Sequence, residues 1–214
     1  MCENIKYANT PLKTNKAEYE YLKKILEKKF IYIAASVHEK ETELFFVLHK
    51  KILDKHPNTV CIFAPRHSET CSKMISLLDA DAHSWSYLPN NDLKPDNKFL
   101  IINEVGILGT YFELSQIAVI GGSFDTIGGH NPIEAIQKNC IVLHGENIQN
   151  FSDIYESLDK LKCSFLTKDA DSIMQKIEDY ICQPNKKQDT LKNINTIISK
   201  KKVLIENEIL DLSL

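Results

Sequence analysis

The sequence predicts an α/β protein in which a parallel sheet is covered by helices on both faces. Short apolar runs of strand type alternate along the chain with segments whose apolar residues recur at helical spacing. Most of the helical segments are about ten residues long, which suits the crossover connections of a parallel sheet. Together these two observations favour a Rossmann-like architecture.

The first half of the chain begins with a helix and a strand. Residues 16–29 place Tyr19, Leu22, Ile25 and Leu26 at helical spacing, and residues 30–35 then form an unbroken apolar run. The same pattern repeats downstream. We expect helices over 39–55 and 68–78 and strands over 60–64, 85–88 and 99–102, with a polar turn over 89–97 between the last two strands.

The second half continues the alternation. The expected elements are a helix over 107–114, a strand over 117–120, a glycine-rich segment over 121–129, a helix from 132, a strand over 141–143, a helix over 154–161, a strand over 165–166 and a helix over 172–181. The carboxyl ends of the strands are the positions to inspect, because open parallel sheets bind ligands there.

The composition changes after Pro184. Residues 186–212 are polar, with apolar side chains at helical spacing, which predicts an amphipathic helix that the run 200–202 could break. Its apolar face requires a partner. We therefore expect three parts: a linker-like segment over 1–14, a Rossmann-like domain over 15–185, and a C-terminal amphipathic helix over 186–214.

Composition excludes several classes of function. With 214 residues, 43% of them hydrophobic and 26% charged, the chain can bury a sizeable core and is not expected to be disordered or fibrous. Its net charge of -3 gives no general reason to expect nucleic acid. No apolar run approaches a membrane span of roughly 20 residues, and residues 1–13 lack the apolar core of a signal peptide. We expect a soluble, cytoplasmic chain.

The cysteines predict neither metal nor redox chemistry. They occur at positions 2, 61, 71, 140, 163 and 182, without a CxxC pair or a histidine at zinc-finger spacing. Cys61 lies within an apolar run and Cys140 directly precedes another. Buried free thiols are therefore the better interpretation than disulfides.

Polar residues follow three of the predicted strands. The first strand ends in Ser36-Val37-His38-Glu39, the second in Pro65-Arg66-His67, and the strand over 117–120 in Gly121-Gly122-Ser123. Each histidine alone is compatible with a surface or capping role. Arg66 is well placed to grip a phosphate or carboxylate with its planar fork, although a structural salt bridge is the alternative. All three ends belong to the same edge of the sheet.

Residues 121–134 carry the strongest local signal, because they hold four of the chain's 7 glycines. Glycine pairs allow positive φ and close approach by a ligand. Asn131, Pro132 and Glu134 have the pattern of a helix start, with Asn as N-cap. The segment is thus either a well-capped helix after a tight loop or a phosphate site at a helix N-terminus. Glu134 could then accept hydrogen bonds from ribose hydroxyls.

These blocks, with Glu104-Val105-Gly106-Ile107-Leu108 and the opening Asn4-Ile5-Lys6-Tyr7, resemble the C-terminal half of the 3-deoxy-D-manno-octulosonic acid (Kdo) transferases of lipopolysaccharide synthesis. The resemblance implies the C-terminal domain of a GT-B glycosyltransferase, which binds the donor CMP-Kdo for inverting transfer to a lipid A precursor without an essential metal or other cofactor. It also implies work at the inner face of the inner membrane.

Carried over residue by residue, the resemblance implies that the CMP moiety is surrounded by the glycine segment, and that the phosphate or the Kdo carboxylate faces the first two strand ends. The predicted substrate-binding residues are Ser36, His38, Arg66, His67, Gly122, Ser123, Gly128, Gly129, His130, Asn131 and Glu134. No catalytic residue is assigned. Glu39 and Glu41 are the only carboxylates near the predicted site, and neither is favoured as the base.

The chain also departs from the family pattern, with Lys40-Glu41-Thr42 after His38 and Ser68-Glu69-Thr70 after His67. The family's N-terminal half carries the acceptor site and the base, and we expect a separate polypeptide to supply them and to pair with the tail helix. Two alternatives remain open: a non-catalytic nucleotide-binding fragment of such an enzyme, or another nucleotide-sugar glycosyltransferase or epimerase.

Overall fold

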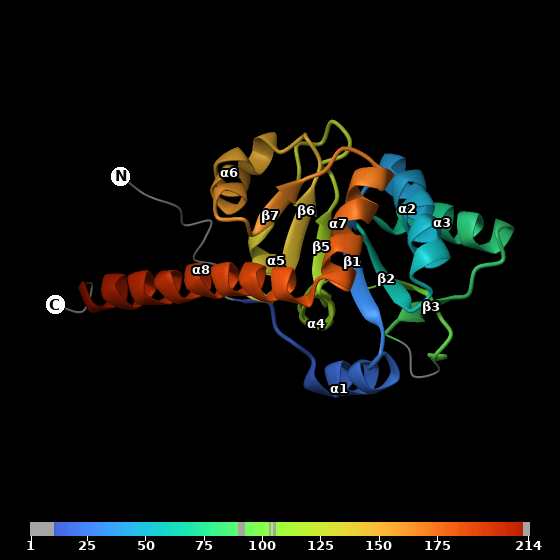
Figure 1. Cartoon of the computed structure of the whole chain (residues 1–214), viewed down its shortest axis with the longest axis horizontal. Coiled ribbons are helices and arrows are strands. Elements are labelled where there is room, and N and C mark those ends of the chain that lie inside the picture. The colour runs from blue at the N-terminus through green and yellow to red at the C-terminus, as the bar shows by residue number, and fades with distance from the viewer. Residues whose placement is uncertain (1–10, 90–92, 103, 105, 212–214) are drawn as a thin grey trace.

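A computed structural model describes residues 11–89, 93–102, 104 and 106–211 of the chain. Seven strands form one sheet in the order β3-β4-β2-β1-β5-β6-β7, and every neighbouring pair is parallel (Figure 1). The strands are β1 Phe30–Val37, β2 Thr59–Pro65, β3 Trp85–Leu88, β4 Phe99–Ile102, β5 Ile117–Ile120, β6 Ile141–His144 and β7 Ser164–Leu166. The predicted parallel α/β class is confirmed.

The helices lie on both sides of this sheet. One group contains α2 (Thr42–Lys55), α3 (Ser68–Ala80) and α7 (Ala170–Cys182), and α2 packs against the other two. A second group contains α1 (Lys16–Ile25), α4 (Leu108–Leu114) and α5 (Ile133–Gln137). The remaining elements are α6 (Ser152–Lys160), α8 (Pro184–Asp211) and two 3-10 turns, η2 (Glu39–Glu41) and η3 (Gln149–Phe151) (Figure 1).

The position of β1 determines where a ligand can bind. After β1 the chain forms β2, β3 and β4 on one side of that strand, with β3 at the edge of the sheet, and then returns to place β5 against the other side of β1. The direction of winding therefore reverses between β1 and β5. In doubly wound sheets the connecting loops diverge at such a point and leave a crevice beyond the carboxyl ends of the strands.

The structure refines the predicted boundaries. β1 runs two residues further than expected, to Val37, because it continues past a bulge at Ser36. β3 and β4 pair in parallel, although they are close in sequence. The helix expected from Pro132 begins at Ile133 and has only 5 residues. The linker expected over residues 1–14 lies mostly outside the described residues.

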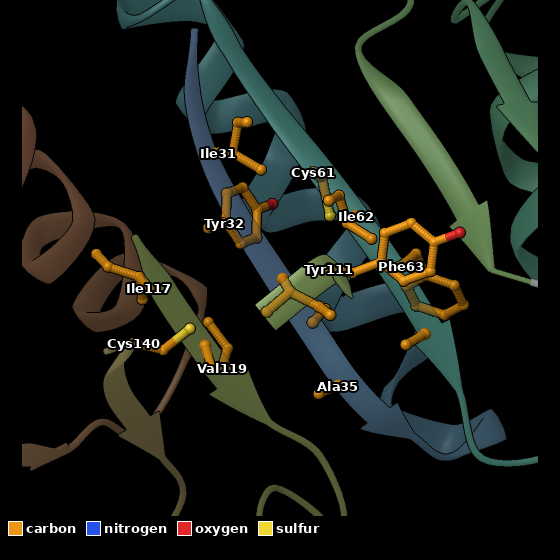
Figure 2. Packing of buried hydrophobic residues seen from close by; sticks show 14 of the residues in the cluster. Ile31, Tyr32, Ala35, Cys61, Ile62, Phe63, Tyr111, Ile117, Val119 and Cys140 are labelled. Carbon is orange, nitrogen blue, oxygen red and sulfur yellow. The ribbon is translucent and has the colours of Figure 1, made fainter. Parts of the chain in front are cut away.

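The core consists of the central strands and the helix faces against them. Every residue of β4, β5 and β6 is buried, as are nearly all of β1 and β2, which explains why these strands are continuous apolar runs. Figure 2 shows Ile31, Tyr32 and Ile62 on neighbouring strands, with Tyr111 of α4 close by. Each such large side chain contributes roughly 1.5–3 kcal/mol through its burial.

The C-terminal helix is continuous. α8 runs without interruption from Pro184 to Asp211, so the break expected over 200–202 is absent. Its first half packs on the domain, since Ile194 is fully buried and the hydroxyls of Tyr180 and Thr190 lie 3.2 Å apart. The helix then extends beyond the sheet (Figure 1). Helical continuity across three lysines is reasonable because lysine is a good helix former.

The five described cysteines are free thiols. Four of them are buried, whereas Cys182, at the end of α7, is exposed. The expectation of free thiols is thus confirmed, and burial holds for all of the described cysteines except Cys182.

A histidine lies in the apolar core. His49 of α2 is buried, and its Nδ1 lies 3.1 Å from the hydroxyl of Tyr32 on β1. Its ring also contacts Phe99 of β4 edge to face, at 5.3 Å between centroids. Burial lowers the pKa of His49 from 6.5 to about 3, because the cation would lose its hydration there.

We predict that this histidine makes the fold sensitive to acid. Because the folded-state pKa is depressed, the neutral ring stabilises the fold fully above pH 6.5, and this contribution is lost as the pH falls towards 3. The slope due to one such group approaches about 1.4 kcal/mol per pH unit. In urea titrations between pH 4 and 7, His49→Gln should flatten the pH dependence of the unfolding free energy. The control Ser76→Ala, an exposed substitution on α3 that removes no titrating group, should leave the slope unchanged.

Candidate functional site

The three predicted strand ends meet at one edge of the sheet. β1 lies between β2 and β5, so the residues that follow these strands are brought side by side beyond their carboxyl ends. This is also where the winding of the sheet reverses. The sequence motifs and the topology therefore point to the same place for a ligand.

The end of β1 has an unusual backbone. Ser36 adopts a φ of 58° at a bulge, where the pairing with β2 shifts by one residue. Gly121 lies against this bulge: a Cβ added to it would come within 2.6 Å of the Ser36 carbonyl oxygen. Glycine at 121 is thus required by the close approach of two strand ends. The half-buried side chain of Ser36 remains at the edge of the site.

Glu41 joins the two strand ends. Its carboxylate is almost fully buried, and it accepts hydrogen bonds from the backbone N–H groups of His38 at 3.0 Å, Gly122 at 2.8 Å and Phe124 at 3.0 Å. Both oxygens are occupied in this way, which makes Glu41 a residue that positions the site. Glu39 is exposed and faces the solvent.

Three histidines lie close together beside the strand ends that Glu41 connects. The Nε2 atoms of His38 and His130 lie 2.7 Å apart, within hydrogen-bonding distance, and their rings are nearly parallel, with an interplanar angle of 4°. His67, which follows β2, meets the ring of His38 edge to face at 5.7 Å between centroids. Tertiary structure therefore brings together residues that are 92 positions apart in the chain.

The surroundings of the histidine pair lower the pKa of both rings. Burial lowers the pKa of His130 to about 4, and the nearby His38, Arg66 and His67 lower it further. Burial also lowers the pKa of His38, although Glu41 opposes that effect. A proton on either ring is therefore disfavoured unless a negative charge approaches.

Arg66 is the only arginine among the 26 basic residues of the sequence. It is exposed directly after β2, and its backbone N–H donates to the carbonyl of Val37 at 2.8 Å, which ties the ends of β1 and β2 together. Among the described residues, no carboxylate lies within ion-pair distance of its guanidinium. The structural salt bridge considered as the alternative is thus not formed within the described part of the chain.

A cleft of about 420 Å³ opens beside the histidines. It is lined by residues of η2, the start of α3 and the loop after β5: His38, Glu39, Lys40, His67, Glu69, Thr70, Asp125, Thr126 and Ile127. Lys40 and Asp125 form an ion pair across it at 3.6 Å. A smaller hollow of about 70 Å³ lies next to it around Arg66, so the arginine is accessible from the same edge.

Hydrogen bonds from Asn150, in the 3-10 turn η3, hold the glycine segment in place. The amide of Asn150 donates to the carbonyls of Ile127 and Gly129, and its backbone N–H donates to that of Gly128. Gly128 and Gly129 have φ values of 96° and 77°, which favour glycine. Gly122 also has a positive φ, 69°, and a Cβ there would lie 2.9 Å from the His130 ring.

The remaining predicted residues have different surroundings. Ser123 is fully buried, and its hydroxyl donates to the carbonyl of Ile120 and accepts from the N–H of Gly145, so only its backbone is available to a ligand. The Asn131 side chain accepts from the N–H of Ile133 at 3.0 Å, but the N-cap residue of the short helix α5 is Pro132 and not Asn131 as expected. The dipole of so short a helix is small.

Glu134 does not close a capping box, because α5 has no side-chain cap hydrogen bond. Its carboxyl is half-buried, and burial raises its pKa. Within the described part of the chain it has no hydrogen-bond or ion-pair partner. This half-buried carboxyl, free of protein partners among the described residues, can accept a hydrogen bond from a hydroxyl group.

Sequence reasoning missed the residues that support the site. Tyr155 of α6 donates its hydroxyl to the carbonyl of His130 at 2.7 Å, and Asn147 donates its N–H to the carbonyl of Ser123. With Glu41 and Asn150, they fix the glycine segment through bonds between distant parts of the chain. For Glu41, the spacing from His38 was a usable signal, since an acidic residue three positions after an N-cap is typical of a capping box.

Known structures share this fold. The C-terminal CMP-Kdo binding domain of WaaA from Acinetobacter baumannii aligns with a TM-score of 0.77 over 85% of this chain and 98% of that domain, at 19% identity. Anabaena HepE, in complex with UDP and glucose, aligns with a TM-score of 0.61 over 94% of this chain and 53% of that protein, at 14% identity. In fold, the chain is the C-terminal domain of a GT-B glycosyltransferase.

The sequence comparisons narrow this class. No protein-family model matches the chain. The Kdo transferase of Haemophilus influenzae is 33% identical over 129 residues, and that of Rickettsia bellii is 30% identical over 192 residues, or 89% of this chain. The chain belongs to the Kdo transferase family. The two matches cover 30% and 45% of the relatives, so the chain spans less than half of their length.

We predict that Glu41→Gln destabilises the fold by about 2–3 kcal/mol, because an amide nitrogen would face a backbone N–H that now donates to a carboxylate oxygen. The measurement is urea unfolding followed by circular dichroism. Glu39→Gln, two residues away and exposed, is the control and should change stability little. Equal effects of the two substitutions would contradict the positioning role of Glu41.

Proposed function

We propose that the chain is the donor-binding half of a Kdo transferase and that it binds CMP-Kdo beyond the carboxyl ends of β1, β2 and β5. Family membership and the shared fold with a CMP-Kdo binding domain support the choice of donor. The proposed site lies where the winding of the sheet reverses, between β1 and β5, and this supports the choice of binding place.

The single observation that carries the proposal is the unpaired Arg66 beside the histidine cluster. CMP-Kdo carries a phosphate and a carboxylate, both of which match the planar fork of a guanidinium. A lysine would supply charge without this geometry. We infer that Arg66 binds one of the two anionic groups, with His38, His67 and the side chain of Ser36 beside it.

The cytidine and ribose would lie along the glycine segment. Gly122, Gly128 and Gly129 expose the backbone there, and the carboxyl of Glu134, which has no partner among the described residues, offers an acceptor for ribose hydroxyls. His130 would lie between this part of the site and the anionic groups. Ser123 and Asn131 would contribute through the backbone, because their side chains bond within the protein.

An inverting transfer also needs a base for the acceptor hydroxyl. The best-placed carboxylate, Glu41, is occupied by three backbone N–H groups. We propose that an N-terminal transferase half, expected as a separate polypeptide, supplies the base and the lipid A precursor site and pairs with α8. Among the described residues, no helix is long and apolar enough to cross a membrane. We also propose peripheral attachment at the inner face of the inner membrane, as the family resemblance implies.

We predict that Arg66→Ala weakens CMP binding by about ten- to a hundredfold, the effect of losing one charge-assisted pair. The affinity of Arg66→Lys for CMP should lie between those of the wild type and of Arg66→Ala, since lysine keeps the positive charge and lacks the planar guanidinium. Isothermal titration calorimetry measures both. Lys192→Ala, which removes an exposed cation paired only with Asp189 on α8, is the control. Unchanged affinity in Arg66→Ala would remove Arg66 from the site.

We also predict nucleotide selectivity. CMP should bind more tightly than UMP or UDP in the same titrations, if the donor is CMP-Kdo. Tight UDP binding without CMP binding would instead favour another nucleotide-sugar enzyme, and HepE shows that this fold occurs in a protein crystallised with UDP.

Transfer itself requires the second half. We expect no Kdo transfer from CMP-Kdo to a lipid A precursor by this chain alone, and transfer once a candidate N-terminal half is added. Activity of the chain alone would contradict the assignment of the base to that half. A chain that binds CMP and gives no transfer with any such half would favour the non-catalytic alternative.

A further inference from the structure

We propose that the His38–His130 pair is a proton-accepting anion subsite, which takes up one proton from solvent when the anionic donor binds. This inference rests on the proposed function. It adds a charge that the empty site lacks: an imidazolium that forms only in the complex and neutralises one negative charge of the donor.

The geometry of the pair limits it to one added proton. With the Nε2 atoms 2.7 Å apart, one nitrogen must donate and the other accept. A further proton can enter at Nδ1 of the donating ring, which becomes a cation and still donates through Nε2. On His38 this proton displaces the hydrogen bond that the side chain accepts from the backbone N–H of Glu41, which keeps the carbonyl of His38 as its acceptor. A second added proton is excluded, because both Nε2 atoms would then carry a hydrogen and the two N–H groups would point at each other. The pair therefore has a charge of zero or +1.

The surroundings keep the empty pair neutral. Arg66 and His67 face it from the end of β2 and disfavour a proton, and partial burial disfavours it on both rings. On the opposite side are two acidic groups that favour a proton on His38: Glu41 from η2 and Asp125 from the loop after β5. Both are already engaged, Glu41 by three N–H groups and Asp125 by Lys40 and Thr126.

The cleft allows an anion to reach the pair. His38 and His67 line it together with Lys40, and its acidic groups are Asp125, which pairs with Lys40, and the exposed Glu39 and Glu69. Arg66 lines the adjoining hollow, which shares His67 with the cleft. A phosphate or carboxylate bound by Arg66 on the side of His67 would lie beside the imidazoles and would raise their pKa, since a nearby opposite charge favours the charged form. Binding an anion and binding a proton then favour each other.

The experiment measures protons taken up per ligand bound. The probe is the methyl ester of CMP, a phosphodiester without a titrating proton near neutral pH, so any proton comes from the protein. Titration calorimetry at pH 6 to 8 in buffers of different ionisation enthalpy should show uptake of up to one proton. The affinity should fall as pH rises, by at most about tenfold per pH unit.

Variants locate the proton. His38→Gln should abolish both the uptake and the pH dependence, and His56→Gln, whose ring pairs with Glu178 at the opposite end of the sheet, should preserve them. The wild-type protein decides the matter even if His38→Gln fails to fold.

Two results would overturn the proposal. Binding of the ester with heats that do not depend on the buffer at any pH would refute proton uptake and leave the donor-site assignment intact. No binding of either the ester or CMP would refute both.

Discussion

The carboxylate of Glu41 accepts three backbone hydrogen bonds from two segments that are about 80 residues apart in the chain, as its bond to Gly122 shows with a separation of 81. Burying a charge is costly, and here the cost is offset because both oxygens receive charge-assisted bonds. These bonds set the distance between the end of β1 and the glycine segment. His38 and His130 can meet only when that distance is correct.

The glycine segment owes much of its composition to packing. Gly121 lies against the bulge at Ser36, and Gly122 against the ring of His130, and in both places a Cβ would lie within 3.0 Å of other atoms. The close approach of a ligand is thus not the only reason for glycine here. The same crowding makes the segment rigid, which favours binding because little conformational entropy remains to be lost.

The distribution of charge fits a binding half better than a complete active site. Two acidic groups at the site are engaged, Glu41 by backbone N–H groups and Asp125 by Lys40. Glu39 and Glu69 also line the cleft and are exposed. Arg66 has no acidic partner among the described residues, so its guanidinium is the group that suits an anion. This arrangement fits the proposed donor-binding role.

The sequence by itself determined the parallel α/β class, the order of the elements and the strand ends that carry polar groups, because apolar periodicity and glycine pairs are local signals. Only the tertiary structure decided which of those groups face a ligand. Ser123 and Asn131 resemble binding residues in the sequence, yet their side chains bond to Gly145 and Ile133. Glu41 resembles a surface carboxylate, yet it is buried. Side-chain direction depends on contacts between distant segments, and these exist only once the sheet has placed β5 beside β1.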